Sequence, residues 1–211
     1  MEIRTRSGNI YSYNKQTGEI LGGSISAQLP KWNFAPFVPF ESMPQVDSFI
    51  LGLTEQCNLR CTYCCYSGNY VNKRSHNTVS MNTDDVDDIL LFIGSFTSNR
   101  PIKIFLYGGE PLLNYNIVQY AIEKSRKQWD NDVSFTISTN GTTLTKERID
   151  WLVANNVVLA LSIDGTKPFH DSYRVDAQGN GSYTRVYDAL KYIKTTYPAL
   201  TRRELHILTK L

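Results

Sequence analysis

Phe49-Ile-Leu-Gly-Leu-Thr54-Glu-Gln-Cys57-Asn-Leu-Arg-Cys61-Thr-Tyr-Cys64 is the most informative stretch of this 211-residue sequence. Its apolar start predicts a buried strand, and the loop after that strand carries three cysteines at C-x3-C-x2-C spacing. Cysteine thiolates are the usual ligands of iron–sulfur clusters, and a cluster of four irons normally takes four of them. Three thiolates would therefore leave one iron open to another ligand.

Two other uses of these cysteines stay open at this point. Structural zinc takes four nitrogen or sulfur ligands, usually as two separated pairs. Here only the adjacent Cys65 or the histidines at 76, 170 and 206 could complete such a site, and no second pair exists. Disulfides are less suitable, because four cysteines within nine positions would close only one loop.

Composition excludes several classes of protein. With 22 basic and 20 acidic residues, the net charge is +2, and no basic stripe indicates a nucleic-acid binder. No apolar run approaches the roughly 20 residues of a membrane span. The first residues lack the apolar core of a secretory signal, so we expect a cytoplasmic protein without nucleic-acid or membrane partners.

Residues 1–47 differ from the rest in residue pattern and composition, which predicts a separate N-terminal part. Ile10–Tyr13 and Glu19–Leu21 flank a glycine-containing turn, which predicts a β-hairpin. The segment Pro30–Pro39 is rich in proline and aromatic residues and favours a strap packed on the main domain. A peptide-docking edge is the alternative for this region.

Residues 48–211 alternate between strand and helix patterns, which predicts a parallel β/α series. Thr83, Thr145 and Ser182 are the expected helix-capping residues. Strands are expected at 48–54, 102–107, 133–138, 157–163 and 204–208. The fold class is therefore α/β, a partial parallel (β/α) barrel of about five units, incomplete at its C-terminus, with an N-terminal hairpin.

The unusual residue clusters all follow predicted strands. In parallel β/α folds, sites form at the carboxyl ends of the strands. The cysteines follow the first strand, Gly108-Gly-Glu-Pro111 the second, Asn140-Gly the third, and the fourth ends at Ser162 and is followed by Asp164-Gly. Glycine pairs allow close backbone approach, although this motif taken alone is more typical of an ordinary strand-to-loop turn. We expect these clusters to share one rim.

Two residues beyond the fourth strand bear on that rim. Arg174 carries a guanidinium, which pairs carboxylates bidentately. His170, taken in isolation, is expected to be a structural hydrogen bonder, and we assign it no catalytic role. Ser162 could bind a ribose or satisfy a neighbouring backbone group.

The cysteine spacing with Tyr63 before the last cysteine, together with Gly108–Pro111 one unit later, resembles the radical S-adenosylmethionine (SAM) superfamily. The run Asp164–Tyr183 resembles the corresponding loop of sulfatase-maturating enzymes and peptide maturases, a branch with a C-terminal extension. The resemblance implies that Cys57, Cys61 and Cys64 hold a 4Fe-4S cluster. It also implies SAM contacts at Tyr63, Gly108, Gly109, Glu110, Pro111, Asn140, Ser162 and Arg174.

The same resemblance implies the partners and the reaction. SAM would be cleaved reductively to a 5'-deoxyadenosyl radical that abstracts hydrogen from a substrate, which in this branch is a peptide or small protein. A low-potential flavodoxin or ferredoxin would supply the electron. The sixth strand and the extension of that branch are absent, so we expect a truncated chain. The alternatives are an inactive fragment or a metal-stabilised peptide-binding module.

Overall fold

The computed structural model describes residues 2–4, 8, 10–13, 20–22, 46–67, 75–96, 101–129, 133–200 and 204–209. The chain forms two compact units, Met1–Ser42 and Met43–Leu211, each of which is considered by itself. The predicted strap at Pro30–Pro39 lies outside the described residues.

The first unit contains a three-stranded antiparallel sheet in the order β1-β2-β3. Its strands are β1 (Glu2–Arg4), β2 (Ile10–Tyr13) and β3 (Ile20–Gly22). The β2–β3 pairing confirms the predicted hairpin. Strand β1 was not predicted, because three residues are too short to show an alternating pattern.

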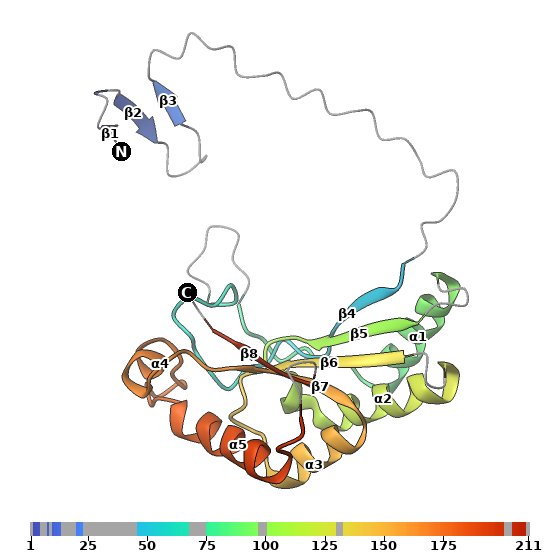
Figure 1. The fold of residues 1–211 in the computed structure, drawn as a ribbon. Helices are drawn as coiled ribbons and strands as arrows, with labels where there is room; N and C mark the ends of the chain where they lie inside the picture. The colour runs from blue at the N-terminus through green and yellow to red at the C-terminus, as the bar shows by residue number, and fades with distance from the viewer. Residues whose placement is uncertain are drawn as a thin grey trace. The chain divides into compact units, whose positions relative to one another are not determined.

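The second unit is built on a five-stranded parallel sheet in the order β4-β5-β6-β7-β8, which confirms the predicted partial (β/α) barrel (Figure 1). Each strand pairs with the next strand in the sequence, as β/α units in a barrel do. The strands are β4 (Ser48–Gly52), β5 (Ile102–Tyr107), β6 (Val133–Thr139), β7 (Val157–Ser162) and β8 (Leu205–Leu208).

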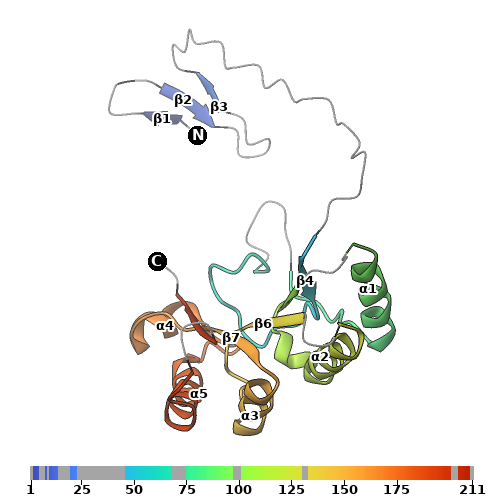
Figure 2. The same cartoon turned by 45° about the vertical axis from the view of Figure 1, so that its right-hand side comes forward.

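Helices lie along one face of this sheet (Figures 1 and 2). No described helix is long and apolar enough to cross a membrane. Helix α4 was not predicted, since its seven residues are too few to show a helical period. The helices are α1 (Thr83–Phe96), η1 (Pro111–Asn114), α2 (Tyr115–Trp129), α3 (Lys146–Ala154), α4 (Lys167–Tyr173) and α5 (Tyr183–Thr196).

The core lies between the sheet and the helices. Along β5, buried and exposed residues alternate strictly, so Ile102, Ile104 and Leu106 join the core while Phe105 and Tyr107 belong to the other face. Burying each such apolar side chain contributes about 1.5–3 kcal/mol. The opposite face of the sheet is therefore available to form the wall of a site.

Of the three predicted helix caps, the structure confirms one and corrects two. Thr145 caps α3 as predicted, accepting a hydrogen bond from the Arg148 amide. The prediction for Thr83 was wrong, because Asn82 Oδ1 accepts from the amides at 84 and 85 instead. Ser182 stands at the N-cap position of α5, yet its hydroxyl makes no capping bond and points to other partners.

Candidate active site

The cysteine loop leaves the carboxyl end of β4 and is anchored by buried residues. Leu53 and Leu59 belong to the buried core of the described chain, and Thr54 is 2% exposed. Cys57, Cys61 and Cys64 are half-buried, whereas Cys65 is exposed. All four cysteines line one cavity of about 550 Å³. The predicted ligands therefore share one concave site.

Burial controls the protonation of these thiols. It raises the pKa of Cys57, and it raises that of Cys61 to about 11. Burial also raises the pKa of Cys64, and repulsion between neighbouring thiolates acts in the same direction. The Arg174 guanidinium partly opposes this at Cys61. A bound metal centre would replace these protons, because coordinated thiols are deprotonated.

The cysteines supply the thiolate donors that an iron–sulfur cluster requires. Among the residues that the structure describes, no three His, Cys, Asp or Glu side chains come together closely enough to hold one metal ion. Structural zinc needs four ligands converging on one point. The thiolates around a 4Fe-4S cluster bind different irons, so they can stand further apart. The donor set here is compatible with the second arrangement.

The glycine pair after β5 packs against the cysteine loop. The Gly109 amide donates to Thr54 O at 2.7 Å, and the Glu110 amide donates to Gln56 O at 2.7 Å. A Cβ built on Gly108 would lie 2.3 Å from Thr54 O, and Gly108 has a φ of +150°. The glycines are thus required by the chain's own backbone, and Gly109 also lines the cavity.

Glu110 connects this loop to the end of β6. Its side chain is 1% exposed, and its carboxylate accepts hydrogen bonds from the amides of Leu112 and Asn140 and from the Thr139 hydroxyl, at 2.7–3.1 Å. Burial raises the pKa of Glu110, while these three donors oppose that shift. The residues lining the cavity do not include Gly108, Glu110 or Pro111, so their predicted SAM contacts stay predictions.

Asn140 extends this connection to the first cysteine. Its amide nitrogen donates to Asn58 Oδ1 at 3.0 Å and lies 3.8 Å from Cys57 Sγ. Thr142 completes the contact, since it bonds to both asparagine side chains. Asn140 therefore lines the cavity and also holds the Cys57 side of the loop in place.

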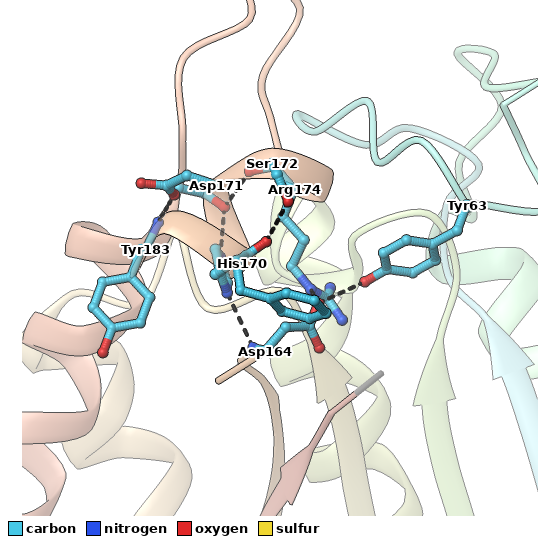
Figure 3. A network of polar contacts seen from close by, with 9 residues as sticks. Tyr63, Asp164, His170, Asp171, Ser172, Arg174 and Tyr183 are labelled. Carbon is cyan, nitrogen blue, oxygen red and sulfur yellow. Dashed lines mark hydrogen bonds and ion pairs between the residues drawn. The ribbon is translucent and has the colours of Figure 1, made fainter. Parts of the chain in front are cut away.

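Tyr63, Asp164 and Arg174 form a polar cluster, of which Tyr63 and Arg174 line the cavity (Figure 3). Arg174 Nε donates to Asp164 Oδ2 at 2.6 Å, and the Tyr63 hydroxyl donates to the same oxygen at 3.1 Å. The guanidinium carbon lies 5.3 Å from the centre of the Tyr63 ring. Asp164 is fully buried, so the carboxylate depends on these donors.

The structure brings most of the predicted site residues to one cavity. Tyr63, Gly109, Asn140, Ser162 and Arg174 line it together with the cysteines. Sequence analysis missed the bracing role of Asp164, although its place directly after the fourth strand was visible. It also missed further lining residues, which are Leu59, Cys65, Tyr107, Ser138, Thr139, Leu208 and Thr209.

Comparison with known proteins identifies the family. The model of the radical SAM superfamily matches residues 51–202. The chain belongs to this superfamily. A cysteine-type anaerobic sulfatase-maturating enzyme of Clostridium novyi is 28% identical over 165 residues, covering 75% of this chain and 44% of the relative. A serine-type anaerobic sulfatase-maturating enzyme of Bacteroides thetaiotaomicron is 30% identical, covering 65% of this chain and 34% of the relative.

Solved structures show the same fold. Native anSMEcpe with bound AdoMet matches with a TM-score of 0.63 and 23% identity, covering 77% of this radical SAM chain and 43% of that protein.

A further relative by sequence is a GTP 3',8-cyclase of Haemophilus influenzae, which is 32% identical over 124 residues, covering 57% of this chain and 34% of the relative. The chain thus spans less than half the length of these relatives.

Proposed function

We propose that the protein is a radical SAM enzyme whose cofactors are a 4Fe-4S cluster and SAM. The observation that carries this proposal is that Cys57, Cys61, Cys64 and Arg174 all line one cavity. A cluster on these thiolates would supply one electron, taken from a low-potential flavodoxin or ferredoxin, to cleave SAM into methionine and a hydrogen-abstracting 5'-deoxyadenosyl radical.

The chain's own residues bind and orient SAM in this proposal. The Arg174 guanidinium lines the cavity while its Nε is held by Asp164, so the group is presented in a fixed orientation for the SAM carboxylate. Ser162, which ends β7 and lines the cavity, is the proposed contact of the SAM ribose, and the Tyr63 ring is proposed to pack beside the 4Fe-4S cluster or the adenine. Asn140 holds the Cys57 side of the cysteine loop in place through its contacts with Asn58 and Cys57.

The proposed substrate is a peptide or a small protein. The similarity to two sulfatase-maturating enzymes supports this class, and the solved structures include anSMEcpe with AdoMet and the Cp18Cys peptide. The open face of the sheet, where Phe105 and Tyr107 are exposed, offers aromatic surface next to the cavity. We place the enzyme in the cytoplasm, where thiols stay reduced.

The first test measures iron, labile sulfide and zinc in anaerobically reconstituted protein, followed by the EPR spectrum of the reduced sample with and without SAM. We expect about four irons and four sulfides per chain and a spectrum that changes on adding SAM. Zinc without sulfide would refute the proposal in favour of a metal-stabilised peptide-binding module. A cluster whose EPR spectrum does not change on adding SAM would indicate an inactive fragment.

Cysteine variants test the ligand assignment. Cys61→Ala is expected to abolish cluster assembly, because it removes one of the three half-buried thiols. Cys65→Ala is the matched control, since Cys65 is exposed and is not among the predicted ligands. Full iron and sulfide in Cys61→Ala, or equal losses in both variants, would contradict the assignment.

A further inference from the structure

A chain of buried hydrogen bonds lies beside the Tyr63–Asp164–Arg174 cluster (Figure 3). The Asp164 amide donates to His170 Nδ1 at 3.1 Å. His170 Nε2 lies 2.9 Å from Ser182 Oγ, and the Ser182 hydroxyl donates to the Arg174 carbonyl at 2.7 Å. His170 and Ser182 are fully buried, so water does not compete for these bonds.

The two ends of this hydrogen-bond chain determine which imidazole nitrogen carries the proton. The backbone amide of Asp164 can only donate, so His170 Nδ1 must accept and carries no hydrogen. The Arg174 carbonyl can only accept, so it takes the single hydrogen of the Ser182 hydroxyl. Ser182 must then accept from His170 Nε2–H. The imidazole is therefore neutral and is the Nε2–H tautomer.

The surroundings of the imidazole favour the same protonation state. Burial lowers the pKa of His170, and the Arg174 guanidinium lowers it further. Asp164 and Asp171 act in the opposite direction, and Lys167 adds to the lowering. From α5, the Tyr183 ring packs edge-on against the imidazole at 5.5 Å.

The chain of bonds closes into a ring around the Arg174–Asp164 pair. The Asp164 amide forms one end and the Arg174 carbonyl the other, and the two side chains are joined by the 2.6 Å ion pair. Both the main chain and the side chain of Arg174 are thereby fixed relative to Asp164. His170 is the member that bridges the gap between the β7 loop and the start of α5.

The segment held by this ring also contacts the cysteine loop. The Arg60 amide donates to Val175 O at 2.6 Å, and the Thr62 amide donates to Tyr173 O at 3.0 Å. These two bonds stand on either side of Cys61. A displacement of the segment at 173–175 would therefore reach both the guanidinium and the cysteine loop.

We propose that His170 is a positioning residue of this site, which as the neutral Nε2–H tautomer fixes the Arg174 guanidinium against Asp164 and toward the cavity. The part of this inference that concerns SAM rests on the proposed function. The part that concerns the guanidinium does not, and it can be tested on the protein without cofactors.

The first experiment reads the tautomer directly. The chain has three histidines, so a long-range proton–nitrogen correlation spectrum of protein labelled with ¹⁵N-histidine is simple to assign with single variants. At about pH 7.5, His170 should show an unprotonated Nδ1 and a protonated Nε2. A protonated Nδ1, whether in the other tautomer or in the imidazolium, would overturn the proposal.

The second experiment follows the guanidinium. His170→Asn keeps an acceptor near the Nδ1 position, His170→Gln keeps a donor near Nε2, and His170→Ala keeps neither. We expect hydrogen exchange of Arg174 Nε–H to accelerate about five- to tenfold in the Ala variant and less in Asn and Gln, since one net hydrogen bond corresponds to about that factor. Exposed His206→Gln is the matched control and should not change the exchange.

SAM affinity separates the two proposals. If reduced wild-type protein gives no SAM-dependent EPR change, the proposed function fails, while the tautomer and exchange data still decide the role of His170. If wild type responds, the Ala variant should bind SAM about tenfold more weakly with an unchanged iron content. Wild-type exchange and affinity in both the Asn and the Gln variant would overturn the positioning role even if the Ala variant fails to fold.

Discussion

Substituting Gly109 tests whether the close backbone packing of the two loops requires a glycine at this position. A Cβ on this residue would lie 2.2 Å from Gln56 O, 2.6 Å from Gln56 C and 2.9 Å from Glu55 O. All three are backbone atoms, so no side-chain rotation can relieve the contact. Moving the nearest contact from 2.2 Å to the shortest real Cβ separation of 3.0 Å requires the two loops to part by 0.8 Å.

That separation breaks two hydrogen bonds. The bonds from the Gly109 amide to Thr54 O and from the Glu110 amide to Gln56 O are both 2.7 Å long, and an extra 0.8 Å would take each to 3.5 Å. Losing two bonds at about 1–2 kcal/mol each gives a destabilisation of about 2–4 kcal/mol for Gly109→Ala. The lower conformational entropy of the unfolded chain with Ala at this position offsets about 0.4–1 kcal/mol of this destabilisation.

Urea unfolding followed by circular dichroism measures the effect. With a slope of about 3 kcal/mol per molar urea, the expected net loss lowers the midpoint by about 0.5–1 M. Gly52→Ala is the matched control, because its Cβ would meet nothing within 4 Å and its midpoint should not fall. An unchanged midpoint for Gly109→Ala with weakened SAM binding would refute the packing argument and leave ligand approach as the reason for this glycine.

Three further outcomes are expected. Glu110→Gln should lower the free energy of unfolding by about 1–3 kcal/mol, because an amide nitrogen would face the donors that the carboxylate now accepts from; equal urea midpoints would contradict this. Thr145→Ala should cost about 1 kcal/mol through the lost cap of α3, whereas Thr83→Ala, which caps nothing, should cost less in the same assay. The lowered pKa of His170 means that below the ordinary value of 6.5 the unfolded chain binds a proton that the folded chain does not, so stability should decline as the pH falls below 6.5. Thermal melts at several pH values should show a smaller decline in His170→Asn, and identical pH profiles would count against this assignment.

The β/α order of the main unit could be predicted from local patterns. Strand and helix periods, the Thr145 cap and the cysteine spacing each involve residues close together in the sequence. The same local reasoning failed at α4 and β1, which are too short to show a period. It also misassigned Thr83, because its neighbour Asn82 has an equally suitable side chain and only the backbone geometry chooses between them.

The sequence by itself determined that a parallel β/α unit would carry Cys57, Cys61 and Cys64 on the same rim as the glycine pair, since strand order and loop position follow from local pattern. Only the tertiary structure decided that Glu110 is buried and that the Ser182 hydroxyl hydrogen-bonds to His170 instead of capping its own helix. The physical reason is that a buried polar group takes whichever partner the packing brings within reach. Asn140 lies 30 positions from Glu110 and His170 lies 12 positions from Ser182, so neither pair belongs to a local pattern.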